Sequence, residues 1–135
     1  MAERPLMKLT TTVLDAPSAE DLAAFYERLL GWIRREKESD WVLLAPPEGG
    51  HWLAFQDEPA YVRPVWPAGP GDQQMSVHLD IKVDDLEAAV AYAVSVGATL
   101  PDFQPQDDVR VLLDPAGHPF CFYLLMTGRG PSTRC

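Results

Sequence analysis

Residues 77–97 read VHLDIKVDDLEAAVAYAVSVG, and this stretch determines the fold. Its first seven residues alternate between apolar and polar side chains, which is typical of a β-strand buried on one face. Leu79 and Ile81 belong to the apolar face, whereas His78 and Asp80 belong to the polar face. Apolar side chains then recur with helical spacing up to a final glycine. The stretch therefore predicts one strand followed by one amphipathic helix.

The same order of elements occurs earlier in the chain. Residues 9–31 read LTTTVLDAPSAEDLAAFYERLLG, which is a strand-like segment, a turn and an amphipathic helix that ends at glycine. We predict helices near residues 19–30 and 85–96. Ser18 and Asp84 are the expected N-caps, because short polar side chains accept hydrogen bonds from the first free backbone N–H groups of a helix.

More strand-like sequence follows each helix. The first repeat continues with residues 41–44 and 52–56, and the second continues with residues 109–113 and 120–125. A turn rich in Pro and Gly separates the two segments of each pair, as expected for hairpins. Residues 57–74 between the repeats also contain many Pro and Gly residues, so we predict a linker that runs over the surface.

These elements predict a single α+β domain over residues 1–135, built from two repeats. Repeat 1 spans about residues 8–56 and repeat 2 about residues 75–126. Neither repeat can bury both faces of its own sheet. We therefore expect paired modules that form one cupped mixed sheet, with the helices on the convex face and a binding site in the cup.

Composition narrows the classes of function. The net charge of −9 disfavours nucleic-acid binding, since phosphates need a basic surface. No apolar run reaches the roughly 20 residues that cross a bilayer. The N-terminus lacks the basic and apolar regions of a secretion signal, so we expect a cytoplasmic protein. For Cys121, inside a predicted strand, and Cys135, the last residue, we predict free thiols.

Three segments resemble one known superfamily. They are Leu-Leu-Gly-Trp at residues 29–32, the segment from His78 to Glu87, and Asp-Pro-Ala-Gly-His-Pro-Phe at residues 114–120. Together they are similar to the glyoxalase / bleomycin-resistance / extradiol-dioxygenase (vicinal oxygen chelate) superfamily. The resemblance implies two βαβββ modules and a homodimer. At residue 118, where the superfamily often has Asn, we interpret the histidine as a turn residue.

The resemblance also implies where a metal would be bound. Metal-dependent members use up to four ligands, two from each repeat, to hold a divalent ion. The corresponding positions are His78 and Cys121 in repeat 2, and Thr11 and a residue of 53–56 in repeat 1. His78 is the only good candidate, Gln56 and Cys121 are weaker, and threonine is a poor ligand. Because a firmly held ion needs three or four donors, we expect no catalytic metal and no other cofactor.

Aromatic side chains should border the cup and favour small-molecule binding, although ordinary core packing is the alternative for each. The predicted ligand-binding residues are His78, Asp80, Thr11, Cys121, Tyr123, Trp41, Trp52 and Phe55.

Two functions follow from these residues. The first is a metal-free protein that binds a small molecule in the cup. The acidic composition would suit a cationic molecule, but solubility alone also accounts for that composition. The second is a metal-dependent lyase, isomerase or dioxygenase of the glyoxalase type, with a non-standard ligand set that includes His78. The sequence assigns no catalytic residue, and the loss of the metal ligands favours the first function.

Overall fold

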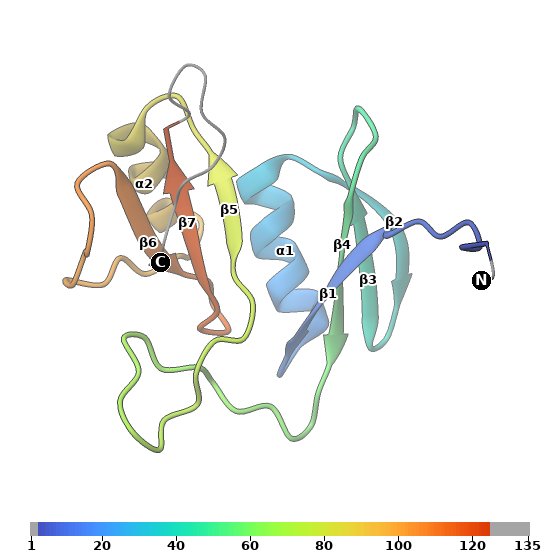
Figure 1. Ribbon diagram of the computed structural model, residues 1–135, viewed down its shortest axis with the longest axis horizontal. Coiled ribbons are helices and arrows are strands. Elements are labelled where there is room, and N and C mark those ends of the chain that lie inside the picture. The colour runs from blue at the N-terminus through green and yellow to red at the C-terminus, as the bar shows by residue number, and fades with distance from the viewer. Residues whose placement is uncertain (1–2, 125–135) are drawn as a thin grey trace. The chain divides into compact units, whose positions relative to one another are not determined.

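The computed structural model describes residues 3–124 of the chain (Figure 1). The chain divides into two compact units, one ending at Glu58 and the other beginning at Pro59. Each unit contains one helix and one mixed sheet (Figure 1), which confirms the predicted α+β class.

The first unit has four strands and one helix. They are β1 (Thr11–Ala16), α1 (Ala19–Leu30), β2 (Ile33–Glu38), β3 (Trp41–Ala45) and β4 (Trp52–Asp57). The strand order is β1-β4-β3-β2, with β1 parallel to β4 and the other pairs antiparallel. The sequence pattern had indicated every element here except β2, whose residues are nearly all charged.

Helix α1 begins and ends where its sequence predicts. The side chain of Ser18 accepts a hydrogen bond from the backbone N–H of Asp21 at 3.2 Å. Gly31 has a φ of 69°, a left-handed conformation that carries little penalty only for glycine. The buried face of the helix packs on the sheet, where the ring of Tyr26 stacks on Phe55 with centroids 5.6 Å apart.

The second unit repeats this plan with fewer strands. It contains β5 (Leu79–Lys82), α2 (Leu86–Ser95), β6 (Val109–Leu113) and β7 (Pro119–Tyr123), in the order β5-β7-β6. Among the described residues, an isolated bridge between Thr99 and Leu113 occupies the place that β2 has in the first unit. Within residues 3–124, the second repeat therefore has three strands, and this single bridge stands where the fourth strand was expected. Pro101 and Pro105 account for this, because proline cannot donate to a ladder of hydrogen bonds.

One further expectation needs correction. The N-cap of α2 is Asp85, whose carboxylate accepts from Ala88 N at 3.1 Å, and not Asp84. The segment predicted as a linker is mostly exposed, and it also contacts the second unit. Arg63 donates to the carbonyl of Pro115 at 2.8 Å, and Trp66 packs against the apolar residues of that sheet. Neither of the helices within residues 3–124 is long and apolar enough to cross a membrane.

Candidate functional site

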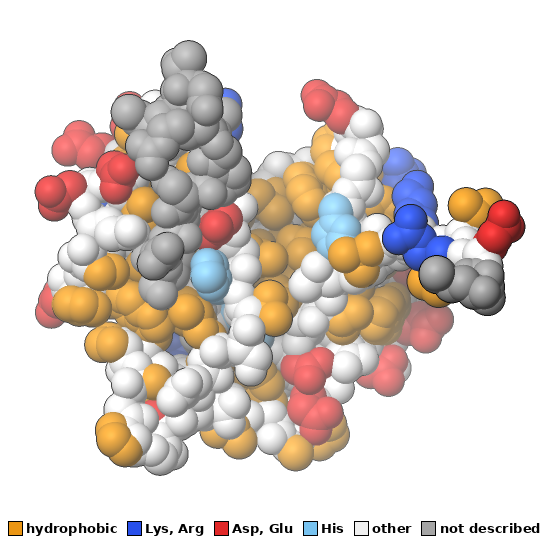
Figure 2. All heavy atoms as spheres, in the orientation of Figure 1, with side chains coloured by type: hydrophobic (Ala, Val, Ile, Leu, Met, Phe, Trp, Pro, Cys, Tyr) orange, Lys and Arg blue, Asp and Glu red, His pale blue; other side chains and the backbone are white. Residues whose placement is uncertain are grey.

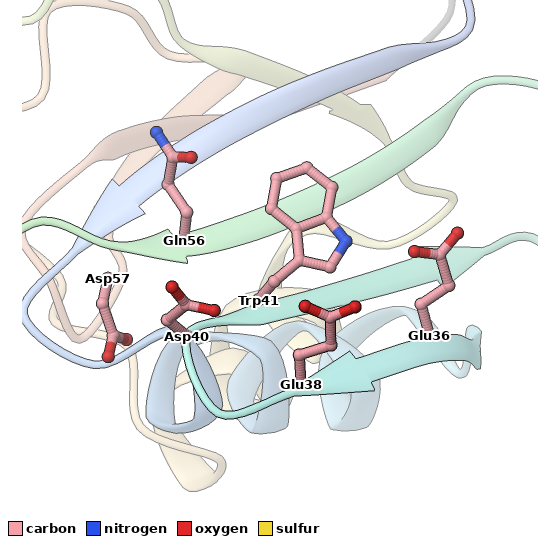
Figure 3. A pocket seen from close by; sticks show the side chains of 6 residues that line it. All are labelled: Glu36, Glu38, Asp40, Trp41, Gln56 and Asp57. Atoms are coloured by element: carbon pink, nitrogen blue, oxygen red, sulfur yellow. The ribbon is translucent and has the colours of Figure 1, made fainter.

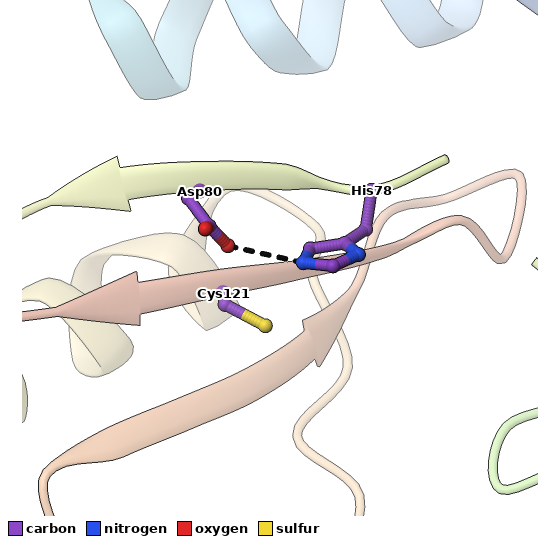
Figure 4. A group of neighbouring side chains, drawn as sticks. All are labelled: His78, Asp80 and Cys121. Carbon is purple, nitrogen blue, oxygen red and sulfur yellow. Dashed lines mark ion pairs between the residues drawn. The ribbon is translucent and has the colours of Figure 1, made fainter. Parts of the chain in front are cut away.

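Three polar or sulfur-containing side chains meet on one face of the second sheet. Strands β5 and β7 pair in parallel with Asp80 opposite Cys121, and His78 lies two residues before Asp80. Nε2 of His78 is 3.2 Å from Oδ1 of Asp80 (Figure 4). One potential ligand atom from each of the three residues lies within 4.8 Å of the others. Alternation along β5 puts Leu79 and Ile81 on the opposite face, as the sequence pattern predicts.

Cys121 is fully buried and disulfide-bonded, which contradicts the predicted free thiol. The only other cysteine of the chain is Cys135, which lies outside the described residues. The prediction was wrong because it relied on the position of Cys135 at the end of the sequence.

The disulfide bears directly on the metal that the superfamily implies. Histidine, carboxylate and thiolate are all suitable ligand types for zinc and related ions. A disulfide sulfur, however, is not a thiolate, so the group offers only His78 and Asp80, which already pair with each other. Three or four fixed donors are needed for a firmly held ion. The residues present in this state therefore do not fit the implied metal.

An apolar surface adjoins His78 and Asp80. Val109, Val111 and Cys121 form a buried cluster, and Tyr123 and Trp66 pack against it. The predicted site residue Tyr123 is thus beside Cys121 in the structure, with its ring half-buried. This face of the second sheet is therefore mainly apolar, and its polar pair, His78 and Asp80, lies at the edge formed by β5.

The first unit also has an open sheet face, opposite α1. The register of β1, β3 and β4 puts Thr11 opposite Trp52 and Trp41 opposite Gln56, on this face. Phe55 lies on the other face, where it is fully buried against Tyr26. The expectation that Phe55 contacts a ligand is therefore wrong, because alternation along β4 turns it into the core.

A pocket of about 390 Å³ lies over part of this open face. It is lined by Glu36, Glu38, Asp40, Trp41, Gln56 and Asp57. Figure 3 shows the side chains of Glu36, Glu38, Trp41 and Gln56 extending away from α1 on the same side of the sheet.

Two residues of this pocket are held by contacts within the first unit. Gln56 donates from Nε2 to Oδ1 of Asp15 at 2.7 Å. Asp57 instead accepts from the backbone N–H of Ala19 at 2.6 Å, at the start of α1. The carboxylate of Asp57 is thus hydrogen-bonded to the start of α1, while the side chain of Gln56 is held on the open face by Asp15.

The acidic side chains of the pocket were not identified from the sequence. Within residues 3–124, the carboxylates of Glu36, Glu38 and Asp40 make no ion pair or side-chain hydrogen bond. Acidic side chains gather near the β2–β3 hairpin in Figure 2. The spacing of Glu36 and Glu38 could have indicated that their side chains lie together, since residues two apart in a strand point to the same side.

Arg34 connects β2, the strand that carries Glu36 and Glu38, to α1. Its guanidinium donates to Glu20 at 2.7 Å and to Glu27 at 3.1 Å, both on the helix. The hydrogen bond from Arg34 is the main reason that the pKa of Glu20 is lowered from its ordinary value of 4.5. The same hydrogen bond to Glu20 raises the pKa of Arg34.

The turn between β6 and β7 holds a third group of polar residues. Asp114 is buried and accepts hydrogen bonds from the backbone N–H groups of Ala116 and His118. Nδ1 of His118 lies 2.8 Å from Oδ2 of Asp114, and Nε2 of His118 lies 3.3 Å from the hydroxyl of Tyr61. His118 is a turn residue, as predicted, but it also connects the turn to the segment after Pro59.

Paired strand–helix–strand units with open sheet faces define the glyoxalase-like class of proteins. The chain belongs to the glyoxalase-like domain family, whose pattern it matches over residues 11–123. No curated protein sequence matches it significantly.

Solved structures share the fold at low sequence identity. A glyoxalase/bleomycin resistance protein/dioxygenase family enzyme from Burkholderia phytofirmans has a TM-score of 0.68 and 18% identity, covering 89% of this chain and 100% of that chain. A glyoxalase-related enzyme from Fulvimarina pelagi has a TM-score of 0.64 and 19% identity, covering 89% of both. TnmS3, an antibiotic-binding protein from a Streptomyces species, has a TM-score of 0.59 and 18% identity, covering 90% and 98%.

Proposed function

We propose that this protein binds a small organic cation and that it does so without a catalytic metal. The observation that carries the proposal is the pocket in which the half-buried Trp41 lies among the carboxylates of Glu36, Glu38 and Asp40. An indole ring attracts a cation through the negative face of its π-system, and neighbouring carboxylates add Coulomb attraction. The net charge of −9 strengthens this preference at longer range.

The comparisons support binding as well as catalysis. One structural relative is an antibiotic-binding protein and others are enzymes of the glyoxalase family. Metal-dependent catalysis is the second candidate, favoured by the proximity of His78, Asp80 and Cys121. Binding ranks first because the disulfide at Cys121 leaves this group short of donors. The homodimer and the cytoplasmic location stay predictions from the sequence.

A pair of probes that differ in charge tests the proposed ligand class. The cation 1-methylquinolinium and neutral quinoline have similar ring systems, and both can be titrated against tryptophan fluorescence at about pH 7.5. We expect the cation to bind more tightly, and its affinity to fall with added salt because salt screens exposed charges. Equal affinity for the two probes would contradict the proposal.

Substitutions test whether the cation binds in the pocket around Trp41. Trp41→Ala should weaken binding of 1-methylquinolinium by about fivefold, the scale of a cation–π contact of about 1 kcal/mol. Trp52→Ala is the matched control, because Trp52 is a tryptophan on the same face of the first sheet but does not line the pocket. Glu36→Gln with Glu38→Gln should reduce both the affinity and its salt dependence. An equal loss in the two tryptophan variants would place the cation elsewhere.

A further inference from the structure

The segment that follows Pro59 is attached to the second unit at two places. At its beginning, Tyr61 and Arg63 contact the β6–β7 turn through the carbonyls of Ala116 and Pro115, each at 2.8 Å. Further along, Trp66 packs on the buried cluster that contains Cys121. Residues 59–66, called the strap from here on, therefore run from the turn to the apolar face of the sheet.

The strap covers a surface that the sequence assigns to ligand binding. Trp66 contacts the cluster of Val109, Val111 and Cys121, on the face shared with Tyr123. Its ring also lies 5.6 Å from the ring of Phe103, measured between centroids. Release of the strap would remove Trp66 from this apolar cluster, and closure keeps Trp66 in contact with it.

The attachment at the turn depends on where protons reside on His118. The carboxylate of Asp114 only accepts, so Nδ1 of His118 must carry a proton to bond to it at 2.8 Å. The single hydroxyl proton of Tyr61 is donated to the carbonyl of Ala116. The contact between Nε2 and the tyrosine oxygen at 3.3 Å is then a hydrogen bond only if Nε2 also carries a proton.

These three contacts are hydrogen bonds at the same time when His118 is the imidazolium ion, because both of its ring nitrogens then carry a proton. Within residues 3–124, the ionisable groups that contact His118 are Asp114 in the turn and Tyr61 in the strap, and the side chain of Arg63 lies beside the neighbouring Gly117. Buried Asp114 supplies the compensating negative charge, while the guanidinium of Arg63 is occupied by the Pro115 carbonyl. In neutral His118 a lone pair on Nε2 would face the oxygen of Tyr61, and the strap would lose this hydrogen bond to the turn.

We propose that the strap is a proton-dependent cover over the Cys121 face, closed when His118 is protonated on both nitrogens and loosened when Nε2 loses its proton. Histidine is the side chain whose charge ordinarily changes between about pH 5 and pH 8. This proposal does not depend on the cation site in the first unit.

Hydrogen exchange of the full chain, followed by mass spectrometry at pH 5.5 and pH 8.0 and corrected for intrinsic rates, tests the proposal. Protection of residues 59–66 should fall by about tenfold at the higher pH, the scale of one hydrogen bond to a charged group. His118→Gln should abolish this pH dependence. His51→Gln is the control and should behave like the wild type, because His51 pairs with Thr12 in the first unit.

Nitrogen NMR of the histidine side chains provides a second measurement that does not need a variant. Both ring nitrogens of His118 should be protonated wherever the strap is protected from exchange, and only Nδ1 should remain so wherever that protection is lost. A neutral His118 at pH 5.5 with a protected strap would overturn the proposal. The same pH dependence of exchange in the wild type and His118→Gln would overturn it as well.

Discussion

His78 and Asp80 are neighbours on one face of β5, with Nε2 of the histidine 3.2 Å from Oδ1 of the aspartate. This pair lies at the edge of an apolar surface and is only half-buried, so it contributes little to the free energy of unfolding. Leu79, between them in sequence, points to the opposite face, where it pairs in register with the fully buried Phe120.

The first prediction concerns this alternation. His78→Ala should change the free energy of unfolding by less than about 1 kcal/mol, as for other exposed ion pairs. Leu79→Ala should cost about 2 kcal/mol, at the low end for leucine because the side chain is not fully buried. Urea denaturation followed by circular dichroism measures both. A larger loss for His78→Ala than for Leu79→Ala would mean that the facing of β5 is reversed.

The second prediction distinguishes two adjacent aspartates at the start of α2. Asp85→Ala should lower the free energy of unfolding by about 1 kcal/mol, the usual cost of losing an N-cap. Asp84→Ala removes the same charge but leaves the hydrogen bond to Ala88 in place, so it should cost much less. Thermal and urea denaturation of the two variants compare them directly. Equal losses would indicate that charge, rather than the cap, accounts for the effect.

The third prediction concerns the ion pair of Arg34 and Glu20. Since the pKa of Glu20 is lowered in the folded protein, its contribution to stability is present above about pH 4.5 and is lost as the pH falls through the folded pKa. Arg34→Met should therefore cost below about 1 kcal/mol at pH 7, allowing for solvent screening. The difference from the wild type should narrow at pH 3.

The control for this variant is Lys37→Met. Lys37 also approaches Glu20, but at 3.9 Å and with a more exposed side chain, so its removal should have a smaller effect at pH 7. A difference between Arg34→Met and the wild type that is the same at pH 3 and pH 7 would show that packing of the arginine, and not its charge, matters.

The fourth prediction concerns the thiol reactivity of Cys121 and the metal content of the protein. Protein purified without reductant or chelator should show no thiol reactivity at Cys121 and far less than one equivalent of Zn, Fe, Ni or Mn by elemental analysis. The reason is that the disulfide leaves two donors where three or four are needed. Elemental analysis and thiol titration of the same sample measure both properties.

A reduced sample provides the comparison. Reduction converts the disulfide to two thiols, so Cys121 could then act as a third donor beside His78 and Asp80. Any metal taken up only after reduction should be lost in Cys121→Ser. A full equivalent of metal in the unreduced protein would show that donors other than these three hold it.

Periodic patterns predicted most of the fold. Both helices and six strands could be assigned from the sequence, because alternation and helical spacing reflect burial directly. Strand β2 could not, because its residues Arg34 to Glu38 are charged on both faces and show no apolar alternation. Its place follows from its pairing with β3 and from the ion pairs of Arg34 with α1, which only the folded structure reveals.

The candidate site was less predictable. Alternation correctly put His78 and Asp80 on one face, but the orientation of Phe55 required the register of β4, which the sequence pattern did not settle. The grouping of Tyr61, Asp114 and His118 joins residues more than 50 positions apart. Contacts of this kind have no local pattern, since they arise from the path of the strap.

Strand β2 has one more consequence, for behaviour at high concentration. It is the outer strand of its sheet, and an outer strand offers unpaired backbone groups to any chain that approaches. Here the register shifts between Arg34 and Glu36, and charged side chains follow one another along the strand. An irregular, charged border is a poor template for another strand, so this side of the sheet resists growth into fibrils.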